Sequence, residues 1–451
     1  MVFREHLGLL GVVAFFGPLL WSVPINAQQA ETNQTTTLAI SLQEAIRRAQ
    51  QNEPAFAAAL GDQRSAAIDH YLAKAAFLPS VIYHNQMVYT QPNGQMTTGV
   101  QPTGQSAPIF IANNAVHEYI SQASINETVG VKQFADVRLA RANAARTEAE
   151  LEVARRGLVA AVVGLYYGVS DTETKRNAFK EALDEARSFT DHTQKREAAR
   201  EVAHADVVKA QLQQQQRQRD LSDAEIAVEK ARLELAVLLF SDPRTPYSVQ
   251  PPTSVQTLPT RDEVNAAAAK YNPEIRSAMA ALEGTDAAVL AAKGAYLPDL
   301  ALNFSYGIDA PQFAKHGPDG VQNLGYSITG TLDIPVWDWL STQKKIKQTQ
   351  IRRDAARVTL SATQRRLIAN LDEVYSEAQT AQQQLDLLGQ SLHTSAESLR
   401  LTKLRYTAGE ATALEVVDAQ TAYTAAQTAQ ADGVVRYQTA LAGLQLLTGT
   451  L

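Results

Sequence analysis

The amino-acid sequence predicts a mainly helical protein that carries a few membrane β-strands. Three observations lead to this fold class: an internal repeat spans the chain, two pairs of segments alternate like amphipathic strands, and one long stretch keeps an unbroken coiled-coil spacing. By length alone, 451 residues would suit two or three globular domains. However, only 7% of them are aromatic, and runs of Ala, Gln and Glu favour long helices with thin packing seams over thick cores.

Charge and cysteine content narrow the possible functions. The chain has 41 Lys and Arg residues against 47 Asp and Glu residues, and this acidic balance disfavours a nucleic-acid partner, which needs a basic surface. The sequence contains no cysteine, which excludes a disulfide framework, a thiolate metal site and a lipid-bearing N-terminal cysteine.

The N-terminus predicts export from the cytoplasm. Arg4 precedes an uncharged apolar stretch, residues 7–23, which Pro18 interrupts and which small residues follow up to Ala27. This pattern is typical of a cleaved signal peptide over residues 1–27, followed by a polar segment, 28–40. The alternative is an N-terminal membrane anchor, but the stretch is shorter than the about 20 residues that a helical span needs.

An internal repeat divides the chain into two halves of the same plan. Residues 41–81 match residues 260–300 without a gap, and Pro79 aligns with Pro298. Each half is expected to contain a helix, two strands and very long helices. The predicted organisation is repeat 1 over 41–240, a Pro-rich connector over 241–259, and repeat 2 over 260–451.

The four predicted strands have the length and pattern of membrane strands. Large apolar residues from Leu300 to Ile308 alternate with small or polar ones, and each segment has about ten residues, which is enough for a tilted strand to cross a bilayer. Aromatic residues at their ends, Phe134, Trp337 and Trp339, suit a membrane interface. The alternative is a pair of soluble hairpins packed on the helices. The strands are expected at about 79–90, 115–129, 299–309 and 323–334.

Four strands cannot close a membrane barrel, because such barrels have at least about eight strands and open edges are not tolerated in lipid. Several chains must therefore share one barrel. Three copies, giving twelve strands, are the simplest closed solution.

The long helices carry a coiled-coil seam. In the second half, steps of three and four residues alternate without a break, which is a 3.5-residue period. The first half keeps the same spacing at Leu151, Ala154, Leu158, Ala161, Leu165 and Gly168. About 65 helical residues would reach roughly 100 Å. A plain coiled-coil stalk is the alternative, although it would not need membrane-length strands in both repeats. The second-half seam consists of Leu367, Leu371, Val374, Ala378, Ala381, Leu385, Leu388, Leu392, Ser395, Leu399, Thr402 and Tyr406.

Together with the repeat and the Leu-Pro turns at Pro79 and Pro298 that lead into strands, the stretch from Tyr406 through Gly409 to Gln420 resembles the TolC-like outer-membrane efflux protein family. The resemblance covers the chain from about residue 38 onward. It implies a homotrimer with a twelve-stranded barrel in the outer membrane of a Gram-negative cell and a helical barrel in the periplasm. It further implies the exit duct of a tripartite efflux or type I secretion system, with a periplasmic adaptor, an inner-membrane pump of the RND or ABC type and outer-membrane lipid as partners, and no cofactor.

The resemblance also implies a closable aperture at the periplasmic helix tips. Tyr406 is the candidate tether, Gly409 the tip turn, and Glu415 and Asp418 the candidate acidic ring. Two departures from the family pattern stand out. Ala411 occupies a position where relatives often have a basic residue, and the first-half tip, residues 195–206, lacks a glycine equivalent to Gly409.

Apart from the family, carboxylates from three chains that converge on one axis would attract cations and repel anions. The alternative for Glu415 and Asp418 is a solvated acidic helix face. The sequence shows no nucleotide-binding loop, nucleophile elbow or zinc-protease helix, so no enzyme and no metal site is expected. The alternative function is a secreted or periplasmic coiled-coil interaction protein without a pore.

Overall fold

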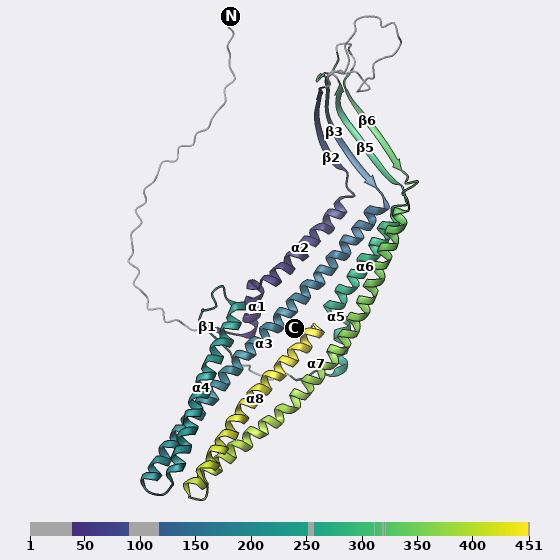
Figure 1. The fold of residues 1–451 in the computed structure, drawn as a ribbon. Helices are drawn as coiled ribbons and strands as arrows, with labels where there is room; N and C mark the ends of the chain where they lie inside the picture. The colour runs from purple at the N-terminus through teal and green to yellow at the C-terminus, as the bar shows by residue number, and fades with distance from the viewer. Residues whose placement is uncertain are drawn as a thin grey trace, which may run out of the picture.

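The protein is an elongated bundle of helices with a small β-sheet at one end (Figure 1). The computed structural model describes residues 38–89, 117–250, 257–310, 312–317, 320 and 322–449. The expected signal peptide, most of the polar segment 28–40, part of the connector and the whole loop between the first two strands lie outside the described residues. The prediction of a mainly helical fold with few strands is confirmed.

The two halves of the chain have the same order of helices. Helices of 11, 22, 68 and 36 residues in the first half correspond to helices of 11, 22, 67 and 36 residues in the second. The first-half helices are α1 (Leu42–Asn52), α2 (Pro54–Ala75), α3 (Val131–Ala198) and α4 (His204–Leu239). The second-half helices are α5 (Arg261–Tyr271), α6 (Pro273–Gly294), α7 (Ser341–Thr407) and α8 (Ala413–Thr448).

Matched prolines separate the short helices in both halves. Pro54 begins α2 and Pro273 begins α6, each at the first helical position, where the missing N–H has no helical partner to lose. In the second half Asn272 caps the new helix by accepting a hydrogen bond from Ile275 N at 3.0 Å. The chain can therefore bend at the same point of each half while both flanking helices stay capped.

The sheet is a four-stranded antiparallel array in the order β2-β3-β5-β6. Its strands are β2 (Ser80–Tyr89), β3 (His117–Val129), β5 (Asp299–Ala310) and β6 (Leu324–Asp333), so both halves contribute a pair. Only β5 extends past its predicted range, by one residue. The outer edges of β2 and β6 have no partner strand among the described residues. A separate two-stranded parallel sheet pairs β1 (Leu38–Ile40) with β4 (Tyr247–Val249).

One face of the sheet is apolar and the other is polar. The register aligns Ile125 with Phe304 and Phe304 with Ile328, so large apolar residues from different strands share a face. The opposite face aligns Ser305 with Ser327 and Asn303 with Thr329. Most large residues of the apolar face are exposed, whereas Tyr119, Ile308 and Leu324 on the same face are half-buried. The exposed ones are Val81, Tyr83, Met87, Tyr89, Ile125, Val129, Leu300, Leu302, Phe304, Tyr306, Tyr326, Ile328 and Leu332.

The hydrophobic core is thin and divided among several clusters along the bundle. The largest cluster surrounds the β1–β4 pair and includes Ile40, Leu235 and Leu239, all of which are buried. A second lies between α5, α7 and α8 around Leu371 and Leu444. None of the described helices is both long and apolar enough to cross a membrane.

The predicted seam of the second half is confirmed, because all twelve of its residues in α7 are buried or half-buried. The seam predicted for the first half is wrong at Ala161, which is exposed. In that part of α3 the buried residues include Val159, Val162, Tyr166 and Val169. The reason is that α3 is covered on two sides here, by the cluster around β1 and β4 and by α8 at Ala442, so a narrow heptad stripe does not describe its buried surface.

Candidate functional site

The candidate site lies where the two long helical hairpins turn, at the end of the molecule far from the sheet (Figure 1). In the turn between α7 and α8, Gly409 has a φ of 80°, and Glu410 N donates to Arg405 O at 2.8 Å. A Cβ at this position would have nothing within 4 Å, so crowding does not explain the glycine. The left-handed backbone does, because glycine adopts it without steric cost.

The turn between α3 and α4 keeps the same geometry without a glycine. Arg200 takes the left-handed position, with a φ of 62°, and Glu201 N donates to Arg196 O at 2.9 Å. The missing glycine therefore leaves the first tip folded like the second one, with the strain carried by an arginine.

Tyr406 joins the last turn of α7 to α3. Its side chain is buried, its ring lies 5.1 Å from the ring of Phe189, and its hydroxyl lies 3.3 Å from Thr193 Oγ1. The residues packed around it, Phe189, Ala210, Ala413 and Val416, come from α3, α4 and α8. The candidate tether is thus the centre of a small core that holds both helical tips together.

Arg196 is a site residue that the sequence did not single out. Its Nη1 donates to Tyr406 O at 2.8 Å, and its guanidinium lies 4.9 Å from the centre of the Tyr406 ring. Its Nε donates to Glu201 Oε2 at 3.0 Å. Only the cationic composition of residues 195–200 marked this segment in the sequence, and no local pattern indicated a contact with α7.

Glu415 has a structural role at the start of α8. Its Oε1 accepts from Thr412 N at 3.1 Å, and its backbone N donates to Thr412 Oγ1 at 3.3 Å, which together form a capping box. Its Oε2 accepts from Arg405 Nη1 at 3.3 Å. The hydrogen bonds from Thr412, and then the charge and hydrogen bond of Arg405, lower the pKa of Glu415, so this carboxylate stays ionised.

Asp418 lies one turn further along α8 and is exposed. The three-residue spacing brings it to the same side of α8 as Glu415. The two carboxylates therefore differ in character: Glu415 is engaged in the helix cap and paired with an arginine, and Asp418 faces solvent in the single chain.

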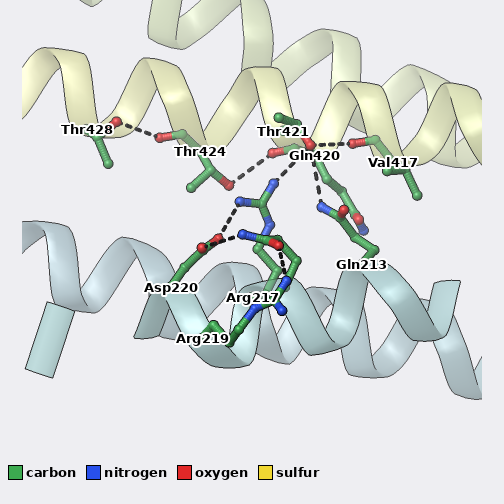
Figure 2. Close-up of polar contacts among 10 residues, drawn as sticks. Gln213, Arg217, Arg219, Asp220, Val417, Gln420, Thr421, Thr424 and Thr428 are labelled. Carbon is green, nitrogen blue, oxygen red and sulfur yellow. Dashed lines mark hydrogen bonds and ion pairs between the residues drawn. The ribbon is translucent and has the colours of Figure 1, made fainter. Parts of the chain in front are cut away.

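Further from the tips, polar contacts join α4 to α8 (Figure 2). Arg217, which is 7% exposed, donates from Nη2 to Thr421 Oγ1 at 2.9 Å and from Nη1 to Asp220 Oδ2 at 3.1 Å. Lys403 of α7 also pairs with Glu185 of α3. The two hairpins are therefore linked by a series of polar contacts as well as by the Tyr406 core.

The candidate interfacial residues all lie where the sheet meets the helices. Pro79 and Pro298 directly precede β2 and β5. The exposed Phe134, in the first turn of α3, packs on Phe77 at a ring distance of 4.8 Å. Trp337 and Trp339, between β6 and α7, are 69% and 85% exposed, and their rings lie 5.8 Å apart. Within the described ranges, no group of three His, Cys, Asp or Glu residues is arranged to hold a metal ion.

Comparisons with known proteins agree with this geometry. The profile of the outer membrane efflux protein family matches residues 265–450. Outer membrane protein OprJ of Pseudomonas aeruginosa is 25% identical over 172 residues, which are 38% of this chain and 36% of OprJ. The match therefore spans about a third of that curated relative.

Solved structures extend the similarity of fold to most of the chain. The CmeC outer membrane channel of Campylobacter jejuni has a TM-score of 0.75 and 17% identity, covering 90% of this chain and 85% of CmeC. The outer membrane protein VceC of Vibrio cholerae has a TM-score of 0.76 and 18% identity, covering 90% of this chain and 96% of VceC.

The fold of this chain is similar to that of solved outer-membrane channels. The resemblance to the TolC-like family that the sequence indicates is confirmed, and residues 265–450 carry the direct match to the outer membrane efflux protein family. The outer-membrane location of these relatives agrees with the location expected from the sequence.

Proposed function

We propose that the protein is a passive exit duct in the outer membrane of a Gram-negative cell, built as a homotrimer with a shared twelve-stranded barrel. Its long helices form a barrel in the periplasm, where they meet a periplasmic adaptor and an inner-membrane pump of the RND or ABC type. The duct supplies a path, and the pump supplies the energy. The main support for the proposal comes from the four-stranded sheet, which has an exposed apolar face and two edges without a partner strand in the described chain.

A single copy of this sheet cannot stand alone in water or in lipid. Its apolar face is open, with Val81, Tyr326 and Ile328 each more than 70% exposed, and both of its outer edges lack a partner strand within the described chain. Lipid would cover the apolar face, and strands of neighbouring copies would satisfy the two edges. Three copies in a ring then turn the polar face, with Asn303 and Ser305, toward an aqueous lumen.

Exposed apolar residues on the two flanking helices, α2 and α7, support contacts between copies. Ile68, Tyr71 and Leu72 of α2 are exposed on one side of the bundle, and Ile351 and Val358 of α7 are exposed on the other. Exposed residues at helical spacing on both flanking helices suit a contact between copies arranged in a ring.

At the tips, we propose that Tyr406 and its partners close the aperture and that Asp418, with Glu415, gives it a negative charge. In a trimer the first turns of three α8 helices would converge. A ring of one sign then favours cations in transit and gives multivalent cations a place to bind.

Neighbouring lysine substitutions on β6 test the proposal. Ile328→Lys places a charge on the apolar face and should reduce assembly into the outer membrane severely, because a lipid-facing lysine near the middle of a bilayer costs about 2–4 kcal/mol. Thr329→Lys, the matched control on the polar face, should assemble and change the conductance in planar bilayers. Equal assembly of both variants, or a parent protein that conducts nothing, would contradict the proposal and favour a coiled-coil protein without a pore.

A further inference from the structure

Arg196 connects the first helical tip to the second one. The turn that follows α7 and the start of α8 contain no Lys or Arg, so they offer no cationic group to α3. We infer that Arg196 makes a cationic link from α3 instead: it is a positioning residue that holds the end of α7 against α3 and keeps the aperture closed. The inference rests on the proposed function as an export channel.

The contact of Arg196 uses the end of a helix. Tyr406 is the last residue but one of α7, where carbonyl groups carry partial negative charge, and its carbonyl also accepts from Gly409 N of the turn at 3.1 Å. The guanidinium donates to the Tyr406 carbonyl at 2.8 Å while lying over the ring of the same residue at 4.9 Å. One side chain of α3 thus contacts both the backbone carbonyl and the aromatic ring of one residue on α7.

Arg196 is itself fixed in this position. Its side chain is 17% exposed, and Nε donates to Glu201 in the turn that follows α3. A planar guanidinium can stack on a ring and donate in its own plane at the same time, which an ammonium group cannot do. The arrangement therefore requires arginine and not simply a positive charge.

The Tyr406 hydroxyl contributes less than its position suggests. Thr193 Oγ1 donates to Phe189 O at 2.8 Å, so the Tyr406 hydroxyl is the donor in its contact with Thr193. That contact measures 3.3 Å, whereas hydroxyl hydrogen bonds are usually about 2.7–2.8 Å long. Of the two polar contacts between Tyr406 and α3, the one made by Arg196 is therefore the stronger, and the tether predicted from the sequence acts through its carbonyl and ring more than through its hydroxyl.

Planar-bilayer recordings of four variants test this assignment. Arg196→Ala should raise the ratio of open to closed channels about tenfold, which corresponds to about 1.4 kcal/mol. Arg196→Lys should give most of that rise, because it keeps the charge and loses the stacked geometry, and Tyr406→Phe should give a smaller one. Lys195→Ala removes the same charge from an exposed neighbouring position and should resemble the parent.

A conducting parent with equal open fractions in Arg196→Ala and Lys195→Ala would overturn the inference and leave the proposed function intact. A larger effect of Tyr406→Phe than of Arg196→Ala would also overturn it, since the hydroxyl would then be the main link.

A second measurement does not depend on conduction. The chain has no natural cysteine, so spin labels can be attached through Ser188→Cys on α3 and Thr407→Cys on α7, both at exposed positions, in samples diluted with unlabelled chain. Arg196→Ala should broaden and lengthen the distance distribution between the labels, and Lys195→Ala should not. An unchanged distance distribution in Arg196→Ala would show that Arg196 does not position the end of α7. A parent that conducts nothing would refute only the proposed function.

Discussion

Arg156 links the middle of α3 to the ends of two helices from the second half of the chain. Its Nη1 donates to Leu446 O of α8 at 3.0 Å, and its Nη2 donates to Tyr271 O, at the end of α5, at 3.1 Å. The side chain is 7% exposed, and Nε pairs with Glu152 at 2.7 Å. We predict that Arg156→Met, which keeps the length of the side chain and removes its donors, destabilises the protein by about 3–5 kcal/mol.

The magnitude follows from what the substitution leaves behind. Two helix-end carbonyls lose a charged donor, and such hydrogen bonds contribute about 1.5–3 kcal/mol each. Loss of the ion pair between Arg156 and Glu152 adds little to this destabilisation, because Glu152 keeps Arg155 as a partner and its side chain is 26% exposed. Hydrogen bonds from Arg155 and, after the opposing effect of desolvation, from Arg156 hold the pKa of Glu152 at about 2.

Thermal unfolding of the purified protein in detergent, at one fixed scan rate, measures the effect. With the usual entropy of unfolding per residue summed over a chain of this length, a destabilisation of about 3–5 kcal/mol lowers the melting temperature by roughly 3–5 °C. Arg146→Met is the matched control, because Arg146 bonds Glu150 and Asn143 within α3 itself, and it should change the melting temperature by less than about 1 °C. Equal decreases in the two variants would show that the hydrogen bonds of Arg156 to Leu446 and Tyr271 do not stabilise the fold.

Four further substitutions test the roles of single side chains. Glu152→Gln should lower the melting temperature at pH 7; because the folded-state pKa of Glu152 is depressed to about 2, the difference from the parent should be full above pH 4.5 and fade as the pH falls toward 2. Arg200→Gly should raise stability by about 1 kcal/mol by relieving the left-handed backbone at a φ of 62°, seen as a higher melting temperature, and a lower one would contradict this. Asp418→Asn should reduce cation selectivity, measured by reversal potentials, with unchanged hydrogen exchange at the start of α8. Glu415→Gln should reduce selectivity and also speed that exchange, since it weakens the helix cap; identical behaviour of the two variants would argue against their different roles.

The regular elements could be predicted from sequence because local pattern determines them. Period-two alternation marked the strands, and a single packing seam marked α7, where one side of the helix is buried along its whole length. The same reasoning failed in α3 around Ala161, because burial there comes from two directions and a periodic pattern records only one.

Part of the site could have been found in the sequence, and part could not. Thr412 and Glu415 have the spacing of a capping box, so the structural role of Glu415 could have been predicted from the sequence. The contact between Arg196 and Tyr406 was not, since the two residues are 210 positions apart and meet only when the helical hairpins pack together. The left-handed Arg200 was equally hidden, because a glycine usually marks that conformation.

Several copies of this chain are proposed to close one pore, and the assembly and conductance of the purified protein are the direct test. Light scattering of the protein in detergent, corrected for bound detergent, gives the number of copies, and the same sample is then inserted into planar bilayers. A mass of three chains and stepwise cation-selective conductance are expected. A stable monomer whose bilayers show no conductance above background would contradict it.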